Sequence, residues 1–88
     1  MPEVKIVVDH KVGLHARPAA IFVKAANKYA SDIQVSKDDR TINAKSILSV
    51  LTLGVNQGTE ITIHAEGDDA DAALQELVAL VKNNFGEE

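Results

Sequence analysis

Hydrophobic and polar residues alternate in four stretches of the chain, and this period of two predicts four β-strands. The four stretches are residues 2–8, 33–35, 41–43 and 60–66. In the first of them, Val4, Ile6 and Val8 fall on one face, which we expect to be buried. The charged turn at residues 37–40 is short enough to predict a hairpin between the second and third strands.

Apolar residues spaced three and four apart predict a first helix from Ala16 to about Tyr29. Pro18 fits the first turn of a helix, because the N–H that proline lacks has no helical partner there. The core-facing residues of this helix are expected to be Ala19, Phe22, Val23 and Ala26. A third helix is predicted from Ala70 to near Asn84, with a core-facing stripe of Ala70, Ala73, Leu74, Leu77, Val78 and Val81.

Between them, residues 47–53 predict a helix of two turns, with Ser46 as its N-cap and Gly54 as its stop. This segment is too apolar for a solvated helix. We therefore expect at least one of its large apolar side chains to face water or a partner.

The order βαββαβα with short connections predicts an α+β fold, in which a mostly antiparallel sheet carries helices stacked on one face. A chain of 88 residues with 45% hydrophobic residues is expected to form a single domain, residues 1–88, around one core.

Composition and charge exclude several classes of function. The chain has a net charge of -4 and 3% aromatic residues, so nucleic acid is not an expected partner. It has no Cys, hence no disulfides or thiolate chemistry. No apolar run reaches the ~18 residues of a membrane span, and the first residues lack a signal pattern. We expect a cytoplasmic protein without membrane insertion, whose partners are proteins or small anions.

The stretch G-L-H-A-R-P-A-A at residues 13–20 contains the candidate chemistry. A helix start offers unpaired backbone N–H groups and a partial positive charge, so His15 is expected at an anion-binding position. A neutral imidazole is a nucleophile, and phosphorylation of His15 would place phosphoryl oxygens against the N–H groups of Ala16 and Arg17. The Arg17 guanidinium could add further donors.

The same residues have other interpretations. His15 could be a plain cap or a surface histidine. His10, His15 and His64 do not have the spacing of metal ligands, and His64 is expected to face outward from a strand. Because of this spacing and the lack of Cys, no metal is expected. The chain has no G-x-S-x-G motif for a hydrolase and no glycine-rich nucleotide loop, and no cofactor is expected. Ser46 could be only an N-cap, although a phosphoserine would be tolerated at a helix start.

With the motif G-L-H-A-R-P-A at residues 13–19, N-A-K-S-I at 43–47 and L-G at 53–54, the chain resembles the HPr family over its whole length. These are the histidine-containing phosphocarrier proteins of the bacterial phosphoenolpyruvate:sugar phosphotransferase system. The resemblance implies an open-faced β-sandwich, in which three helices cover one side of a four-stranded antiparallel sheet.

The resemblance also implies a function. His15 would accept a phosphoryl group on Nδ1 from phosphorylated enzyme I and pass it to the A components of sugar permeases. Arg17 would be the phosphate-side cation, and the Ala16 backbone N–H would face the phosphoryl group. Such a protein is a stoichiometric carrier rather than an enzyme, and we expect a monomer.

By the same resemblance, an apolar docking patch lies beside the site and Ser46 is a regulatory serine. The patch would consist of Ile47, Leu48 and Leu51, with a rim of Ala20, Ile21 and Lys24. An HPr kinase/phosphorylase would modify Ser46, and the modified protein would favour a catabolite-control repressor. A nitrogen-branch carrier shares the histidine motif, and a purely regulatory HPr-like interaction module is a further alternative.

Overall fold

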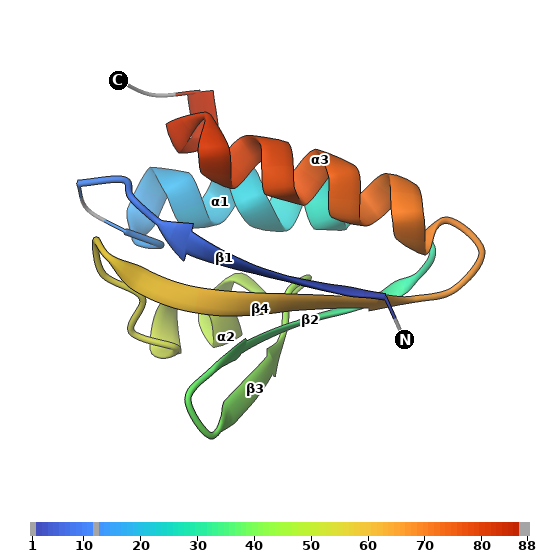
Figure 1. Ribbon diagram of the computed structural model, residues 1–88, viewed down its shortest axis with the longest axis horizontal. Helices are drawn as coiled ribbons and strands as arrows, with labels where there is room; N and C mark the ends of the chain where they lie inside the picture. The colour runs from blue at the N-terminus through green and yellow to red at the C-terminus, as the bar shows by residue number, and fades with distance from the viewer. Residues whose placement is uncertain (1, 12, 87–88) are drawn as a thin grey trace.

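The computed structural model describes residues 2–11 and 13–86 (Figure 1). Its elements are, in order, β1 (Glu3–Val8), α1 (Ala16–Ala26), β2 (Asp32–Lys37), β3 (Arg40–Asn43), α2 (Ile47–Thr52), β4 (Thr59–Glu66), α3 (Ala70–Lys82) and the 3-10 turn η1 (Asn84–Gly86). This is the predicted order of strands and helices.

The four strands form one antiparallel sheet in the order β1-β4-β2-β3. Ile63 in β4 lies opposite Val4 of β1 on one side and Val35 of β2 on the other. These cross-strand neighbours form a continuous apolar surface on one face of the sheet, because alternate residues of each strand point to the same face.

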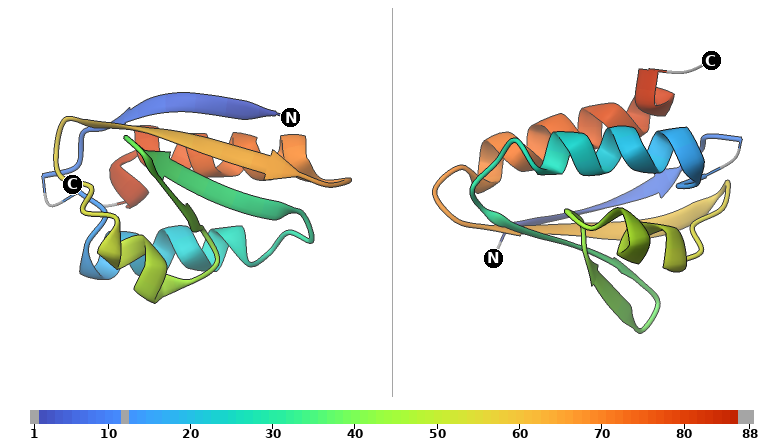
Figure 2. Two further views of the ribbon diagram at one scale, coloured as in Figure 1. Left: turned by 90° about the horizontal axis from the view of Figure 1, so that it is seen from below. Right: turned by 180° about the vertical axis from the view of Figure 1, so that it is seen from behind.

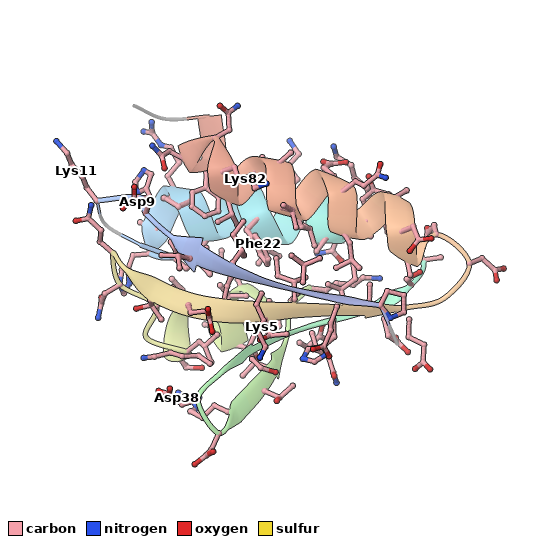
Figure 3. The ribbon with its side chains drawn as sticks, viewed as in Figure 1. Lys5, Asp9, Lys11, Phe22, Asp38 and Lys82 are labelled. Atoms are coloured by element: carbon pink, nitrogen blue, oxygen red, sulfur yellow. The ribbon has the colours of Figure 1, made fainter. Side chains whose placement is uncertain are left out.

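The helices cover that apolar face. Figure 1 and both views in Figure 2 show α1 and α3 side by side over the sheet, with α2 on the other side of α1 from α3. Figure 3 shows Phe22 of α1 pointing into the space between the helices and the sheet, and its ring meets that of Phe85 at a centroid distance of 6.5 Å. The predicted open-faced sandwich is confirmed.

Two predictions for α1 need correction. Helix α1 ends at Ala26 rather than near Tyr29. Beyond Ala26 the N–H groups of Lys28 and Tyr29 donate to carbonyls three residues back, which is the 3-10 pattern rather than the α-helical one. Val23 is only half-buried and Ala25 is buried instead. Helix α1 packs against α3 as well as α2, and Ala25 lies beside Glu76 and Leu80 of α3, so the buried arc of α1 is displaced toward α3.

The end of the chain also differs from the prediction. Val78 of α3 is half-buried, whereas the other residues of its predicted stripe are buried. Phe85 lies in η1 with a φ of 59°, outside any regular helix, and its side chain is buried. The left-handed backbone at this residue turns the aromatic ring back into the core.

Candidate functional site

His15 is the N-cap of α1, as the position of Pro18 predicts. Its backbone is extended, with φ -122° and ψ 157°, and its carbonyl accepts the first helical hydrogen bond, from the N–H of Ala19 at 3.4 Å. The imidazole does not cap the helix. It is half-exposed and therefore accessible to another molecule.

The backbone turns sharply directly after His15. Ala16 has a φ of 43°, in the left-handed region that a residue with a Cβ atom rarely adopts. This conformation costs about 1 kcal/mol, which the surrounding contacts must offset. Arg17 follows in the first turn of α1 with an exposed side chain, so the imidazole and the guanidinium belong to the same short segment.

A second loop fixes the segment before His15. The N–H of Leu14 donates to the carbonyl of Val55 at 3.0 Å. Gly13 has a φ of 67°, and a Cβ atom there would lie 2.1 Å from the Val55 oxygen. The approach of these two loops therefore requires glycine at position 13.

The imidazole of His15 is hydrogen-bonded to that second loop. Its Nε2 lies 3.1 Å from Oδ1 of Asn56, in the connection between α2 and β4. No pattern in the sequence predicts this contact of Asn56. The two residues are 41 positions apart, and neither local periodicity nor a motif brings them together.

The other two histidines have different surroundings. His10 is 8% exposed and its ring meets that of Phe85 at 5.7 Å. His64 lies on the open face of the sheet, as predicted, with Nδ1 3.1 Å from Glu3 Oε1 and Nε2 3.2 Å from Ser36 Oγ. Among the described residues, no cluster of three or more His, Asp or Glu side chains is arranged to hold a metal ion.

The row Glu3–His64–Ser36 has the order of a hydrolytic triad. Ser36, however, lies on β2, which is paired on both sides, with β3 and with β4. The backbone donors around its hydroxyl are therefore engaged in the sheet and cannot form an oxyanion hole. We assign the row to cross-strand stabilisation.

Helix α2 presents the excess apolar surface that its sequence predicts. Val50 and Leu53 are buried, whereas Ile47, Leu48 and Leu51 are 38%, 74% and 37% exposed. These last three residues are called the α2 patch below. A cluster of exposed large apolar side chains on so small a protein is typical of an interaction surface.

Helix α2 packs alongside α1 and runs in the opposite direction. At one end of α2, Asn27 Nδ2 donates to the carbonyl of Lys45 at 3.2 Å, just after α1 ends. At the other end, the loop with Asn56 reaches His15 at the start of α1. The C-terminal end of α2 thus lies next to the loop that contacts His15, and its other end lies next to the end of α1.

The structure divides the expected rim of this patch. Ala20 is exposed and shares a helix face with Asn27, seven residues on, which contacts the start of α2. Ile21 and Lys24 instead line a groove with Glu76 and Leu80 of α3, on the other flank of α1. The half-burial of Ile21 is explained by this second helix, which the periodicity of α1 alone could not reveal.

Two of the nearby lysines are engaged within the fold. Lys28 Nζ lies 2.7 Å from Glu76 Oε2, and Lys45 Nζ donates to the carbonyl of Tyr29 at 2.6 Å. Hydrogen bonds from Lys28 and then from Tyr29 hold the pKa of Glu76 below its usual value. The same carboxylate raises the pKa of Tyr29. These contacts join α1 to α3 and to the start of α2.

Both ends of α2 are held by side chains. Ser46 Oγ accepts from the N–H of Ser49 at 3.3 Å, so the predicted N-cap is confirmed. At the other end, Lys37 Nζ donates to the carbonyl of Gly54 at 2.8 Å, and Arg40 donates to the carbonyl of Thr52. These cations lie at the negative end of the helix and donate to carbonyls that lack a helical partner. The same contacts fix the orientation of the α2 patch.

None of the helices within the described ranges combines the length and the apolar character needed to cross a membrane.

Comparison with known proteins agrees with this geometry. A family model described as the PTS HPr component phosphorylation site matches residues 2–83. The HPr-like protein Crh of Bacillus subtilis is 46% identical over 82 residues, which cover 93% of this chain and 96% of Crh. The phosphocarrier protein HPr of Pseudomonas aeruginosa is 40% identical over 88 residues, or 99% of this chain and 98% of that protein.

Solved structures agree as well. HPr-C-His from Thermoanaerobacter tengcongensis is 51% identical and superposes with a TM-score of 0.97, over 100% of this chain and 99% of that one. HPr from the same organism has also been solved as a dimer, with 50% identity and a TM-score of 0.80 over 99% and 100% of the two chains. The open-faced sandwich is shared with solved structures of the phosphocarrier class. Within that class, the chain belongs to the HPr family.

Proposed function

We propose that this protein is a phosphocarrier of the phosphoenolpyruvate:sugar phosphotransferase system, in which His15 takes a phosphoryl group from phosphorylated enzyme I and passes it to the A components of sugar permeases. The observation that carries the proposal is the half-exposed imidazole at the start of α1, in a chain that matches the HPr phosphorylation-site family over residues 2–83. The setting is the cytoplasm, where the proposed donor and acceptors meet.

The site is suited to reversible transfer. Nδ1 of His15 attacks phosphorus as the bond between phosphorus and the donor atom breaks, and the reverse displacement releases the group to the acceptor. The Arg17 guanidinium and the Ala16 N–H stabilise the phosphoryl oxygens. No second substrate is converted, so the protein is a stoichiometric carrier, regenerated at each transfer.

Docking in this proposal uses the α2 patch, with Ala20 at its edge next to His15. Exposed Arg17 favours acidic partner surfaces, which makes the encounters transient and dependent on salt. Ile21 and Lys24 are the outer rim, and a partner reaches them only if it extends across α1 to the α1–α3 groove.

Ser46 is the proposed regulatory site, modified by an HPr kinase/phosphorylase. Its hydroxyl is half-exposed at the start of α2, directly before the α2 patch. A phosphate there adds almost two negative charges beside an apolar surface. Docking of acidic partners is weakened by this change, whereas a catabolite-control repressor with a basic surface is favoured.

A second candidate is a regulatory interaction module, favoured by the 46% identity to the HPr-like protein Crh. Under this alternative the α2 patch and Ser46 keep their roles, and His15 takes up no phosphate. A nitrogen-branch carrier would use His15 in the same way with different partners.

The deciding experiment is incubation of the full chain with phosphoenolpyruvate and enzyme I. Uptake of phosphate that is acid-labile and base-stable supports the carrier, provided that His15→Ala abolishes the uptake and His64→Ala does not. Absence of uptake by the wild-type protein rejects the carrier and favours the regulatory module. Uptake that survives His15→Ala rejects the assignment of the site.

The transferring form is a monomer in this proposal, because His15 and the α2 patch must both be reachable by a partner. The dimer solved for the Thermoanaerobacter tengcongensis HPr makes the oligomeric state worth measuring. Analytical ultracentrifugation of the full chain over a range of concentrations distinguishes the two states, and a stable dimer that is phosphorylated without dissociating contradicts the monomeric carrier.

A further inference from the structure

We infer that Asn56 is a positioning residue that holds His15 in the tautomer with its proton on Nε2, so that the lone pair of Nδ1 is available to a phosphoryl group. The inference rests on the proposed function and adds a residue to its site. It begins from one contact, the 3.1 Å separation between Asn56 Oδ1 and His15 Nε2.

The chemistry of the two atoms sets the tautomer. An amide oxygen accepts hydrogen bonds and cannot donate one, so the nitrogen that faces it must carry the proton. A neutral imidazole has a single N–H, and Nε2 takes it. Nδ1 is then left unprotonated, and no hydrogen bond from another described residue occupies its lone pair.

The amide is preorganised by the loop that carries it. The N–H of Asn56 donates to Oγ1 of Thr59 at 3.2 Å, and the N–H of Thr59 donates back to the Asn56 carbonyl at 3.1 Å. On the other side, the Val55 carbonyl is bonded to Leu14, directly before His15. The backbone on both sides of Asn56 is therefore fixed relative to the imidazole, which is the requirement for a positioning contact.

This arrangement lets the transfer proceed without moving a proton. The lone pair of Nδ1 forms the new bond to phosphorus while the bond from phosphorus to the donor breaks, and Nε2 keeps its proton throughout. The ring gains positive character when it is phosphorylated. The amide oxygen of Asn56 then faces a more polarised N–H and stabilises the phosphorylated ring.

The neutrality of the side chain also matters. An aspartate at position 56 could accept the same hydrogen bond, but its charge would favour the protonated imidazolium, which has no lone pair to donate. Asparagine provides the acceptor without that charge. Asn56→Ala and Asn56→Asp thus separate two effects, loss of the acceptor and addition of a charge.

The direct test is the tautomer of His15 in the full chain labelled with ¹⁵N. Long-range ¹H–¹⁵N correlation spectra, recorded where the imidazole is neutral, should show a protonated Nε2 and an unprotonated Nδ1 in the wild-type protein. Asn56→Ala should show a mixture of both tautomers. Gln57→Ala is the matched control, because Gln57 belongs to the same loop but donates to the Asp9 carbonyl at 3.3 Å.

A second readout is the initial rate of phosphorylation of His15 with phosphoenolpyruvate and enzyme I. Asn56→Ala should lower this rate by roughly threefold to tenfold, corresponding to one lost hydrogen bond. Asn56→Asp should move the pH profile of the rate upward by about one unit, since the carboxylate stabilises the imidazolium. Arg17, the charged residue next to the site, is unchanged in both variants.

A wild-type His15 with its proton on Nδ1 would overturn the inference, as would an Asn56→Ala protein with unchanged tautomer and unchanged rate. If Asn56→Ala perturbs the backbone spectrum, the isosteric Asn56→Asp decides through its pH profile. Failure of the wild-type protein to accept phosphate would reject the proposed function separately, because the tautomer is measured without phosphorylation.

Discussion

Asp69, directly before α3, accepts a hydrogen bond from the hydroxyl of Ser31, directly before β2. The same carboxylate accepts from the backbone N–H groups of Ala30 at 2.9 Å and Ser31 at 3.0 Å. Gly67 lies beside this contact, where a Cβ atom would come 2.5 Å from Ser31 Oγ. The carboxylate thus joins two connections at the end of the molecule opposite His15.

This contact predicts a pH dependence of stability. The Ser31 hydroxyl, and then the Ala30 N–H, hold the pKa of Asp69 below its ordinary value. Because the native pKa is the lower one, the stabilisation is complete above the unfolded pKa and is lost as the pH falls through the native pKa. The midpoint of urea unfolding, measured from neutral pH down to about pH 2, should decrease as the pH falls. Asp69→Asn should lower the neutral midpoint and reduce this fall, and equal acid slopes in the two proteins would contradict the assignment.

Leu48→Asp should impair phosphoryl transfer while leaving the fold intact. Leu48 is 74% exposed in the α2 patch, so its loss removes little buried surface. A charge there should slow transfer from enzyme I by about tenfold or more, since it repels acidic partners and disrupts apolar contact. Val7→Asp is the control, because Val7 is also exposed, at 49%, but lies on β1 away from the patch. Equal transfer rates for wild type and Leu48→Asp would remove the docking role.

Gly13→Ala should destabilise the protein more than Gly58→Ala. Both glycines have a positive φ, of 67° and 86°, so each substitution carries a backbone cost of about 1–2 kcal/mol. Only at Gly13 would the new Cβ also meet an atom, the Val55 oxygen, whereas no atom lies within 4 Å at Gly58. The free energy of unfolding should therefore fall by roughly 3 kcal/mol for Gly13→Ala. Chemical denaturation measures the free energy of unfolding of both variants. A similar loss in the two would show that the loops carrying Gly13 and Val55 can move apart at little cost.

Substitutions of Ser46 should separate its capping role from its proposed regulatory one. Ser46→Ala removes the oxygen that accepts from Ser49, and should lower the free energy of unfolding by about 1 kcal/mol. Ser46→Asp keeps a capping oxygen, so its stability should stay close to that of wild type. Transfer from enzyme I should be slower in Ser46→Asp and nearly normal in Ser46→Ala. The opposite order of the two rates would reject an electrostatic switch at this position.

Elements set by local chemistry were predictable from the sequence. Alternation predicted that Val4 and Val8 face inward, and the cap at Ser46 and the stop at Gly54 predicted α2 to within one residue. The position of His15 at a helix start followed from Pro18. Each of these depends on residues a few positions apart, where steric and hydrogen-bonding preferences act directly.

Features that depend on neighbours distant in the sequence were not predictable. The periodicity of α1 gives the face of Ile21 but not the presence of Leu80 beside it, so its place in the α1–α3 groove appears only in three dimensions. The burial of Ala25 in preference to Val23 has the same origin. Asn56 has no local signal for function, because its role depends on a loop that meets His15 through the pairing of other segments.

The separation of 41 residues between His15 and Asn56 has a consequence for the order of events in synthesis and folding. A growing chain exposes the histidine, and the local contacts of α1, well before residue 56 exists. The loop that carries Asn56 is anchored by the N–H of Gly58 to the carbonyl of Val8 at 2.7 Å, where β4 begins to pair with β1. Such non-local pairing forms late, because a long loop must first close. Nascent chains that end before residue 56 thus carry the histidine without the asparagine proposed to hold its tautomer, so the full transfer rate proposed for His15 requires the later loop.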